Sequence, residues 1–132
     1  MKKILLCLSI IIIILIVSFY FLNNPKVKLI NSEEFDKLKQ DENIFVLNTH
    51  TPYEGEIEGT DLIIEDWENI KIYENKLPKD KNIKILVYCR TGRMADSAAE
   101  QLLDLGYKNV YNLEGGMKAW EVSGRELIFN KH

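Results

Sequence analysis

Short apolar blocks alternate with helical patterns along most of this chain, and that alternation restricts the folds open to it. The segment from Ile83 to Tyr88 contains the run Ile85-Leu86-Val87, which is typical of a strand buried on both faces. The other predicted strands are residues 27–30, 44–49, 62–64 and 110–113, and the predicted helices are residues 32–40, 67–75, 95–105 and a segment opened by Gly115. Strands that alternate with helices predict an α/β fold, with a mostly parallel central sheet flanked by helices on both faces.

One transmembrane helix is predicted ahead of this sheet. Met1-Lys2-Lys3 precede an uncharged run from Ile4 to Leu22, which as a helix is long enough to cross a hydrocarbon core of roughly 30 Å. The exit from this run lacks the small-residue pattern of a cleaved secretory signal. We therefore expect a signal-anchor at residues 1–24, contact with the membrane through residues 4–22, and one domain at residues 25–132. Lys2 and Lys3 favour a single-pass protein whose domain lies on the extracytoplasmic side.

The charge of the predicted domain disfavours nucleic acid as a partner. The chain has 17 Lys and Arg against 20 Asp and Glu, and removing Lys2 and Lys3 with the anchor leaves 15 against 20, a net charge of −5. A metal centre also lacks support, because His50 and His132 are the two histidines and His132 has no neighbouring ligands in sequence. We interpret His50 as a hydrogen-bonded structural residue.

The segment after Tyr88 has the features of an activated thiol. Cys89 stands between a buried strand and a helix start, where unpaired backbone N–H groups and the positive end of the helix dipole stabilise negative charge. Arg90 and Arg93 favour the thiolate further, and Gly92 allows successive N–H groups to converge on one anion. The pattern predicts a nucleophilic cysteine in a cradle for a small anion.

The chain resembles the rhodanese (sulfurtransferase) family in three motifs that come in the expected order. Cys89-Arg90-Thr91-Gly92 is similar to the start of the family's active loop, Cys-Arg-Ser/Thr-Gly-x-Arg-Ser. The segment from Asn112 to Trp120 is similar to the closing N-L-x-G-G-x-x-A-W motif, and the segment from Thr51 to Thr60 to the first motif, D-V-R-x-P-x-E-[FY] followed by G-H-I-P-G-A. The resemblance spans roughly residues 27–127 and implies a rhodanese-like fold.

The resemblance implies transfer of a sulfane sulfur from a small anionic donor, such as thiosulfate, to a thiol or cyanide acceptor through a persulfide on Cys89. No metal or organic cofactor is implied. The resemblance assigns Cys89 as the catalytic residue. The substrate-binding loop that follows it is Arg90, Thr91, Gly92, Arg93, Met94 and Ala95.

Several positions depart from the family pattern and leave the substrate open. Asn48 and His50 stand where the family usually has Asp and Arg, and Glu56 and Glu58 stand where it usually has His and Pro. The last two loop positions, often Arg and Ser, are Met94 and Ala95, with Arg93 one position early.

Two other classes remain as alternatives to a sulfurtransferase. The changes at Asn48 and His50 keep open a non-catalytic or redox-sensing rhodanese-like binding module, in which Cys89 forms a mixed disulfide or only supports binding. A Cys-dependent phosphatase or arsenate reductase is disfavoured, because the phosphatase signature Cys-x5-Arg requires Arg where the chain has Ala95.

Overall fold

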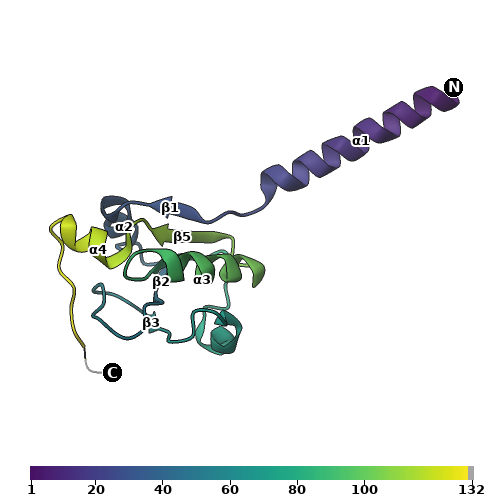
Figure 1. The fold of residues 1–132 in the computed structure, drawn as a ribbon. Helices are drawn as coiled ribbons and strands as arrows, with labels where there is room; N and C mark the ends of the chain where they lie inside the picture. Colours follow the sequence, from purple (N-terminus) through teal and green to yellow (C-terminus); the bar gives the residue numbers. More distant parts are fainter. Residues whose placement is uncertain (131–132) are drawn as a thin grey trace.

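A five-stranded parallel sheet forms the centre of the computed structural model, which describes residues 1–130 (Figure 1). The strands lie in the order β1-β5-β4-β2-β3, so β4 is central and its neighbours are β5 and β2. They are β1 (Lys28–Ile30), β2 (Ile44–Asn48), β3 (Leu62–Ile63), β4 (Lys84–Tyr88) and β5 (Asn109–Leu113). Because all five run in the same direction, their carboxyl ends meet at one edge of the sheet, where ligands of such sheets bind.

Helices cover both faces of the sheet, as the sequence predicts. One face packs against α2 (Ser32–Leu38) and α4 (Gly116–Val122), around Phe35, whose ring makes edge contacts with Tyr88 and Trp120 at centroid distances of 6.0 and 5.9 Å. The opposite face packs against α3 (Arg93–Asp104) and η1 (Ile70–Lys76). The α/β prediction with a sheet flanked on both faces is therefore confirmed, and the strand pairs are parallel throughout.

The helix boundaries follow from local chemistry. Asn31 caps α2, because its Oδ1 accepts a hydrogen bond of 2.9 Å from the Glu34 N–H. Gly106 ends α3 with a φ of +94°, and the N–H groups of Gly106 and Tyr107 return to the carbonyls of Leu103 and Leu102. Both ends were predicted from the sequence.

The segment between β3 and β4 differs from the prediction. The pattern from Trp67 to Asn75 predicts a helix, whereas the structure has the 3₁₀ helix η1 at Ile70–Lys76. Its start is set by a distant residue, since Gln101 Oε1 accepts a 2.9 Å hydrogen bond from the Ile70 N–H. A tertiary contact thus replaces the local cap that an α-helix would need at this point.

The last described residues, 126–130, form a segment that we call the C-terminal strap. Its backbone pairs antiparallel with the loop after β2, through hydrogen bonds of 2.9 and 2.8 Å between Glu56 and Ile128. Trp120 Nε1 donates to the Glu126 carbonyl at 3.0 Å, and Phe129 packs against Gly55. The strap therefore ties the loop that contains residues 51–58 to the body of the domain.

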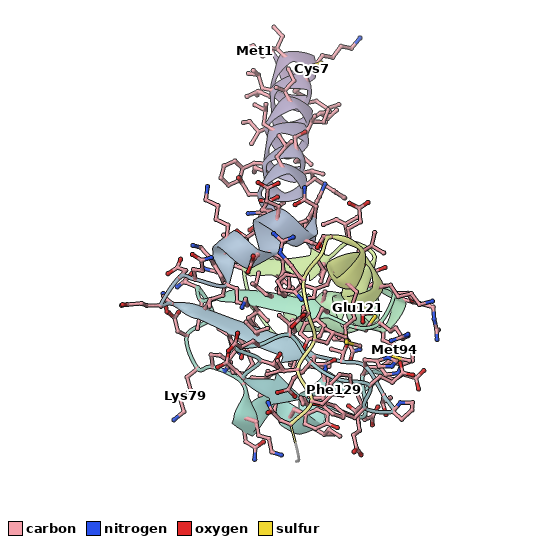
Figure 2. The ribbon with its side chains drawn as sticks, turned by 90° about the vertical axis from the view of Figure 1, so that its left-hand side faces the viewer. Met1, Cys7, Lys79, Met94, Glu121 and Phe129 are labelled. Carbon is pink, nitrogen blue, oxygen red and sulfur yellow. The ribbon has the colours of Figure 1, made fainter. Side chains whose placement is uncertain are left out.

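The N-terminal helix α1 (Lys2–Asn23) projects away from the sheet and buries none of its residues (Figures 1 and 2). By length and composition it is sufficient to cross a membrane, a test that a signal sequence also meets. Its 22 residues span about 33 Å at the helical rise of about 1.5 Å per residue. The division of the chain at residues 24 and 25 stays a prediction.

Candidate active site around Cys89

Cys89 follows the last residue of β4 and lies directly in front of α3. Its side chain is nearly inaccessible, with 2% of the residue exposed. The Gly92 N–H donates a hydrogen bond of 3.0 Å to the Cys89 sulfur, and the Gly92 φ of +110° allows this turn. The N–H groups of the first turn of α3, from Arg93 to Ala95, have no acceptor within the helix and lie beside this loop. The loop can thus stabilise negative charge on sulfur.

The N-terminus of α4 holds the backbone of the same loop. The Met117 N–H donates to the Cys89 carbonyl at 2.8 Å, and the Lys118 N–H donates to the Arg90 carbonyl at 3.1 Å. Gly116, with a φ of +60°, permits this approach, because a Cβ there would come within 2.7 Å of the Arg90 carbonyl oxygen. The loop is therefore fixed from two sides, by α3 and by α4.

A pocket of about 180 Å³ opens over the sulfur. It is lined by His50, Cys89, Arg90, Thr91, Arg93 and Met94. Gly92 takes part through its backbone N–H, whereas the side chain of Ala95 is fully buried in the core under α3. Seven sequence-predicted site residues thus meet in one loop, and five of them line the pocket.

His50 is the pocket residue whose position the sequence did not reveal. It follows β2, and its N–H donates to Asn48 Oδ1 at 2.9 Å. Its Nε2 lies 2.7 Å from Glu54 Oε2, while Nδ1 has no hydrogen-bond partner among residues 1–130. His50 is therefore hydrogen-bonded, as expected of a structural residue, but it also forms one wall of the pocket.

Glu54 links the two sides of the pocket. The same carboxylate oxygen, Oε2, lies 2.7 Å from His50 Nε2 and 3.2 Å from Arg90 Nε. The second arginine, Arg93, lies over the ring of Trp67, with the guanidinium carbon 5.5 Å from the ring centroid. Both arginines thus have partners within the protein.

Two buried asparagines hold the loops around the pocket through hydrogen bonds. Asn48 Nδ2 donates to the Gly55 carbonyl at 3.3 Å, which fixes the turn that carries His50 and Glu54. Asn112, on β5, donates through Nδ2 to Asp96 Oδ1 at 2.5 Å and to the Gly92 carbonyl at 3.5 Å. Asn48 thus holds the loop after β2, and Asn112 ties β5 to the Cys89 loop and to the start of α3.

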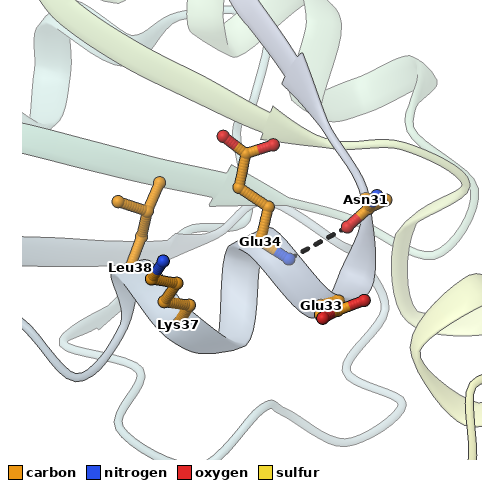
Figure 3. A pocket seen from close by; sticks show the side chains of 5 residues that line it. All are labelled: Asn31, Glu33, Glu34, Lys37 and Leu38. Carbon is orange, nitrogen blue, oxygen red and sulfur yellow. Dashed lines mark hydrogen bonds between the residues drawn. The ribbon is translucent and has the colours of Figure 1, made fainter.

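A second depression, of about 360 Å³, lies over α2 (Figure 3). Its lining side chains come from α2 and its cap: Asn31, Glu33, Glu34, Lys37 and Leu38. None of these is a cysteine, a serine or a histidine. Within residues 1–130, no group of three or more His, Cys, Asp or Glu side chains is arranged to hold a metal ion, and His132 lies outside the described residues.

Comparisons with known proteins find relatives of two kinds. A sulfurtransferase of Allochromatium vinosum is 31% identical over 103 residues, which cover 75% of this chain and 92% of that protein. A tRNA uridine(34) hydroxylase of Leptospira interrogans is 36% identical over 107 residues, which cover 76% of this chain but only 29% of that protein. The chain thus spans less than a third of that hydroxylase.

Solved structures share the fold. A rhodanese-like domain protein of Staphylococcus aureus superimposes with a TM-score of 0.63 at 25% identity, over 80% of this chain and 100% of that one. The family match covers residues 31–123, which include every strand from β2 to β5 and the whole Cys89 loop. This chain therefore belongs to the family of rhodanese-like domains.

Proposed function

We propose that this protein is a sulfurtransferase that carries a sulfane sulfur on Cys89. The Cys89 thiolate attacks the outer sulfur of an anionic donor, and a new S–S bond forms as the bond to the donor's remainder breaks. The electron pair leaves with that remainder, which is sulfite when the donor is thiosulfate. An acceptor thiolate or cyanide then attacks the outer sulfur of the persulfide, and the Cys89 thiolate is regenerated.

The observation that carries this proposal is the Gly92 N–H, which points at the Cys89 sulfur from 3.0 Å. Transfer of sulfur needs a thiolate and a persulfide that are stabilised without a separate base, and N–H groups at the start of a helix supply that stabilisation. The pocket of about 180 Å³ has room for a small donor. The similarity to a sulfurtransferase over 92% of that protein adds support.

The position of Ala95 supports sulfur chemistry over phosphoryl transfer. In a Cys-x5-Arg loop this position must carry an arginine that reaches the bound phosphate. Here the methyl group of Ala95 is fully buried between α3 and the sheet, so the pocket has no arginine from this position.

Mass spectrometry of the intact protein tests the proposal. The full chain with Cys7→Ser, in neutral detergent, keeps Cys89 as its single thiol. Incubation with thiosulfate should add the mass of one sulfur atom, cyanide should remove it, and a further Cys89→Ser change should abolish it. Absence of the adduct with thiosulfate, with a thiosulfonate and with inorganic polysulfide would reject the transferase, and the non-catalytic binding module would then be preferred.

We also propose that α1 anchors the domain as a single-pass helix, with the domain on the extracytoplasmic side. The support is the uncharged run in α1, which has no buried residue, and the Lys2-Lys3 pair that precedes it. Lys79 is exposed on the domain, far from α1 (Figure 2), so a single cysteine placed there in a chain with Cys7→Ser and Cys89→Ser reports the location of the domain. A membrane-impermeant maleimide should label Lys79→Cys in intact cells. Labelling only after permeabilisation would contradict this orientation.

A further inference from the structure

We propose that Glu54 sets the donor preference of the Cys89 pocket, so that the site takes singly charged sulfur donors in preference to doubly charged thiosulfate. The donor class is a monoanion that carries a sulfane sulfur, such as a thiosulfonate or an organic persulfide. This inference rests on the proposed sulfur transfer and adds to it a residue outside the Cys89 loop. Glu54 acts here as a positioning residue, because it touches the pocket walls and not the sulfur.

The contacts of Glu54 place its negative charge between the two walls of the pocket. Its Oε2 lies 3.2 Å from Arg90 Nε and 2.7 Å from His50 Nε2, and both partners line the pocket. The Arg90 side chain is 37% exposed and that of Glu54 is 44% exposed. A bound anion can therefore compete with the Glu54 carboxylate for Arg90. Arg90 thus meets a donor as one half of an ion pair.

The other charged groups near the Cys89 loop do not restore a positive pocket. Arg93 is the second cation, and it lies over Trp67. Asp96, in the first turn of α3, adds a second carboxylate, which accepts a hydrogen bond from Asn112. Lys118, whose N–H donates to the Arg90 carbonyl, is a further cation near the loop, and like Asp96 it is exposed and does not line the pocket. At the pocket walls themselves, the Glu54 carboxylate offsets the charge of Arg90. A dianion gains little from such a site, whereas the backbone N–H groups can still bind a monoanion.

The charge of the donor can be varied at nearly constant shape. Thiosulfate and methanethiosulfonate both present an outer sulfur bonded to a sulfonyl-type sulfur, with charges of −2 and −1. In each reaction the S–S bond of the donor breaks, its electron pair leaves with sulfite or methanesulfinate, and one sulfur remains on Cys89. Because the two leaving groups differ in intrinsic reactivity, the change in the donor ratio between protein variants, and not the ratio in one protein, reports charge.

The substitution Glu54→Gln removes the charge and keeps an oxygen that can accept from His50 and Arg90. A unit charge about 8 Å from the donor, at an effective dielectric constant of about 40, alters binding about fivefold for each charge on the donor. We expect the wild type to have the higher kcat/KM with methanethiosulfonate. In Glu54→Gln the ratio of the two kcat/KM values should shift about fivefold towards thiosulfate. Removal of the negative charge improves the electrostatic binding free energy of a dianion by twice as much as that of a monoanion.

Two matched variants separate charge from structure. Glu58→Gln changes the net charge by the same amount on the same loop, but Glu58 is exposed and contacts Lys39 only through its backbone carbonyl. Glu54→Asp keeps the charge and shortens the side chain. The donor ratio should stay at the wild-type value in Glu58→Gln and near it in Glu54→Asp. A ratio that is the same in wild type and Glu54→Gln would overturn the proposal.

A second readout does not depend on sulfur transfer. In the full chain with Cys7→Ser, Cys89 is alkylated either by iodoacetate, which is negative, or by iodoacetamide, which is neutral. Glu54→Gln should raise the ratio of the iodoacetate to the iodoacetamide rate constant several-fold, and Glu58→Gln should leave it unchanged. If the alkylation ratio shifts in Glu54→Gln but no persulfide forms on Cys89 with any donor, the sulfurtransferase proposal is rejected and the charge effect of Glu54 stands. An unchanged ratio in Glu54→Gln would reject the role of Glu54 even if sulfur transfer is observed.

Discussion

The substitution Gly116→Ala should damage both the fold and the site, because α4 approaches the Cys89 loop too closely for a side chain. A Cβ at this position would lie 2.6 Å from the Arg90 carbonyl carbon and 2.7 Å from its oxygen, and closer still to the Cys89 carbonyl oxygen. These are backbone atoms, so no side-chain rotation relieves the contact. The Gly116 φ of +60° adds the cost of a left-handed backbone.

The magnitude follows from these two contributions. A left-handed conformation costs a non-glycine residue about 1–2 kcal/mol. Overpacking of a tight interior costs about 1–3 kcal/mol. Gly116→Ala should therefore lower the free energy of unfolding by about 2–5 kcal/mol, a large part of the about 5–15 kcal/mol that folded domains possess. It should also slow persulfide formation, since the Cys89 carbonyl must move away from the Met117 N–H.

Gly106→Ala provides the matched control. Gly106 has a φ of +94°, and no atom lies within 4 Å of the position that a Cβ would take, so this variant carries the backbone cost without the contact. Urea unfolding in neutral detergent, followed by tryptophan fluorescence, should give a loss of about 1–2 kcal/mol, with persulfide formation unchanged. Equal stabilities for the two variants would refute the close approach of α4 to the loop.

Two titrations test other parts of the fold. Burial raises the pKa of Tyr88 above its usual value of 10.0, so the neutral phenol stabilises the fold below that pH and the stabilisation is lost as the pH rises further. Tyr88→Phe should abolish this loss of stability at alkaline pH, as measured by urea unfolding. The lost hydrogen bonds with Ile57 and Thr60 should reduce stability at neutral pH. An unchanged dependence of the unfolding free energy on alkaline pH would contradict the raised pKa of Tyr88. The hydrogen bond from Lys84 holds the pKa of Asp41 below 3.8, so Lys84→Gln should raise it in a carboxyl NMR titration, and an unshifted Asp41 would contradict the ion pair.

The sequence predicted the strand, loop and helix around Cys89 because the information there is local. The apolar run before Tyr88 and the apolar residues Ala98, Leu102 and Leu105 at helical spacing predict β4 and α3 without reference to distant segments. The helix begins at Arg93, two residues before the predicted start, because Gly92 itself can adopt the left-handed conformation at the cap.

The contacts that shape the pocket could not be predicted from the local sequence pattern, because they join residues that are distant in the sequence. The ion pair between Glu54 and Arg90 joins two loops that meet only because β2 and β4 are neighbours in the sheet. The interpretation of His50 as a structural residue described its hydrogen bond but not its place in the pocket wall. The start of η1 likewise depends on Gln101, which lies on a different helix.

The C-terminal strap gives the two walls of the pocket different resistance to local opening. The Cys89 wall rests on the central strand and two helices, so the amide protons that β4 donates to its neighbouring strands should exchange only with global unfolding. The loop that carries His50 and Glu54 is held by the strap, through a contact between Asn130 and Glu56 across 74 positions of the chain and one pair of backbone hydrogen bonds between Glu56 and Ile128. The C-terminal strap can therefore detach from this loop while the sheet stays intact. The amide protons of Glu56 and Ile128 should therefore exchange together and earlier than those of the central strands.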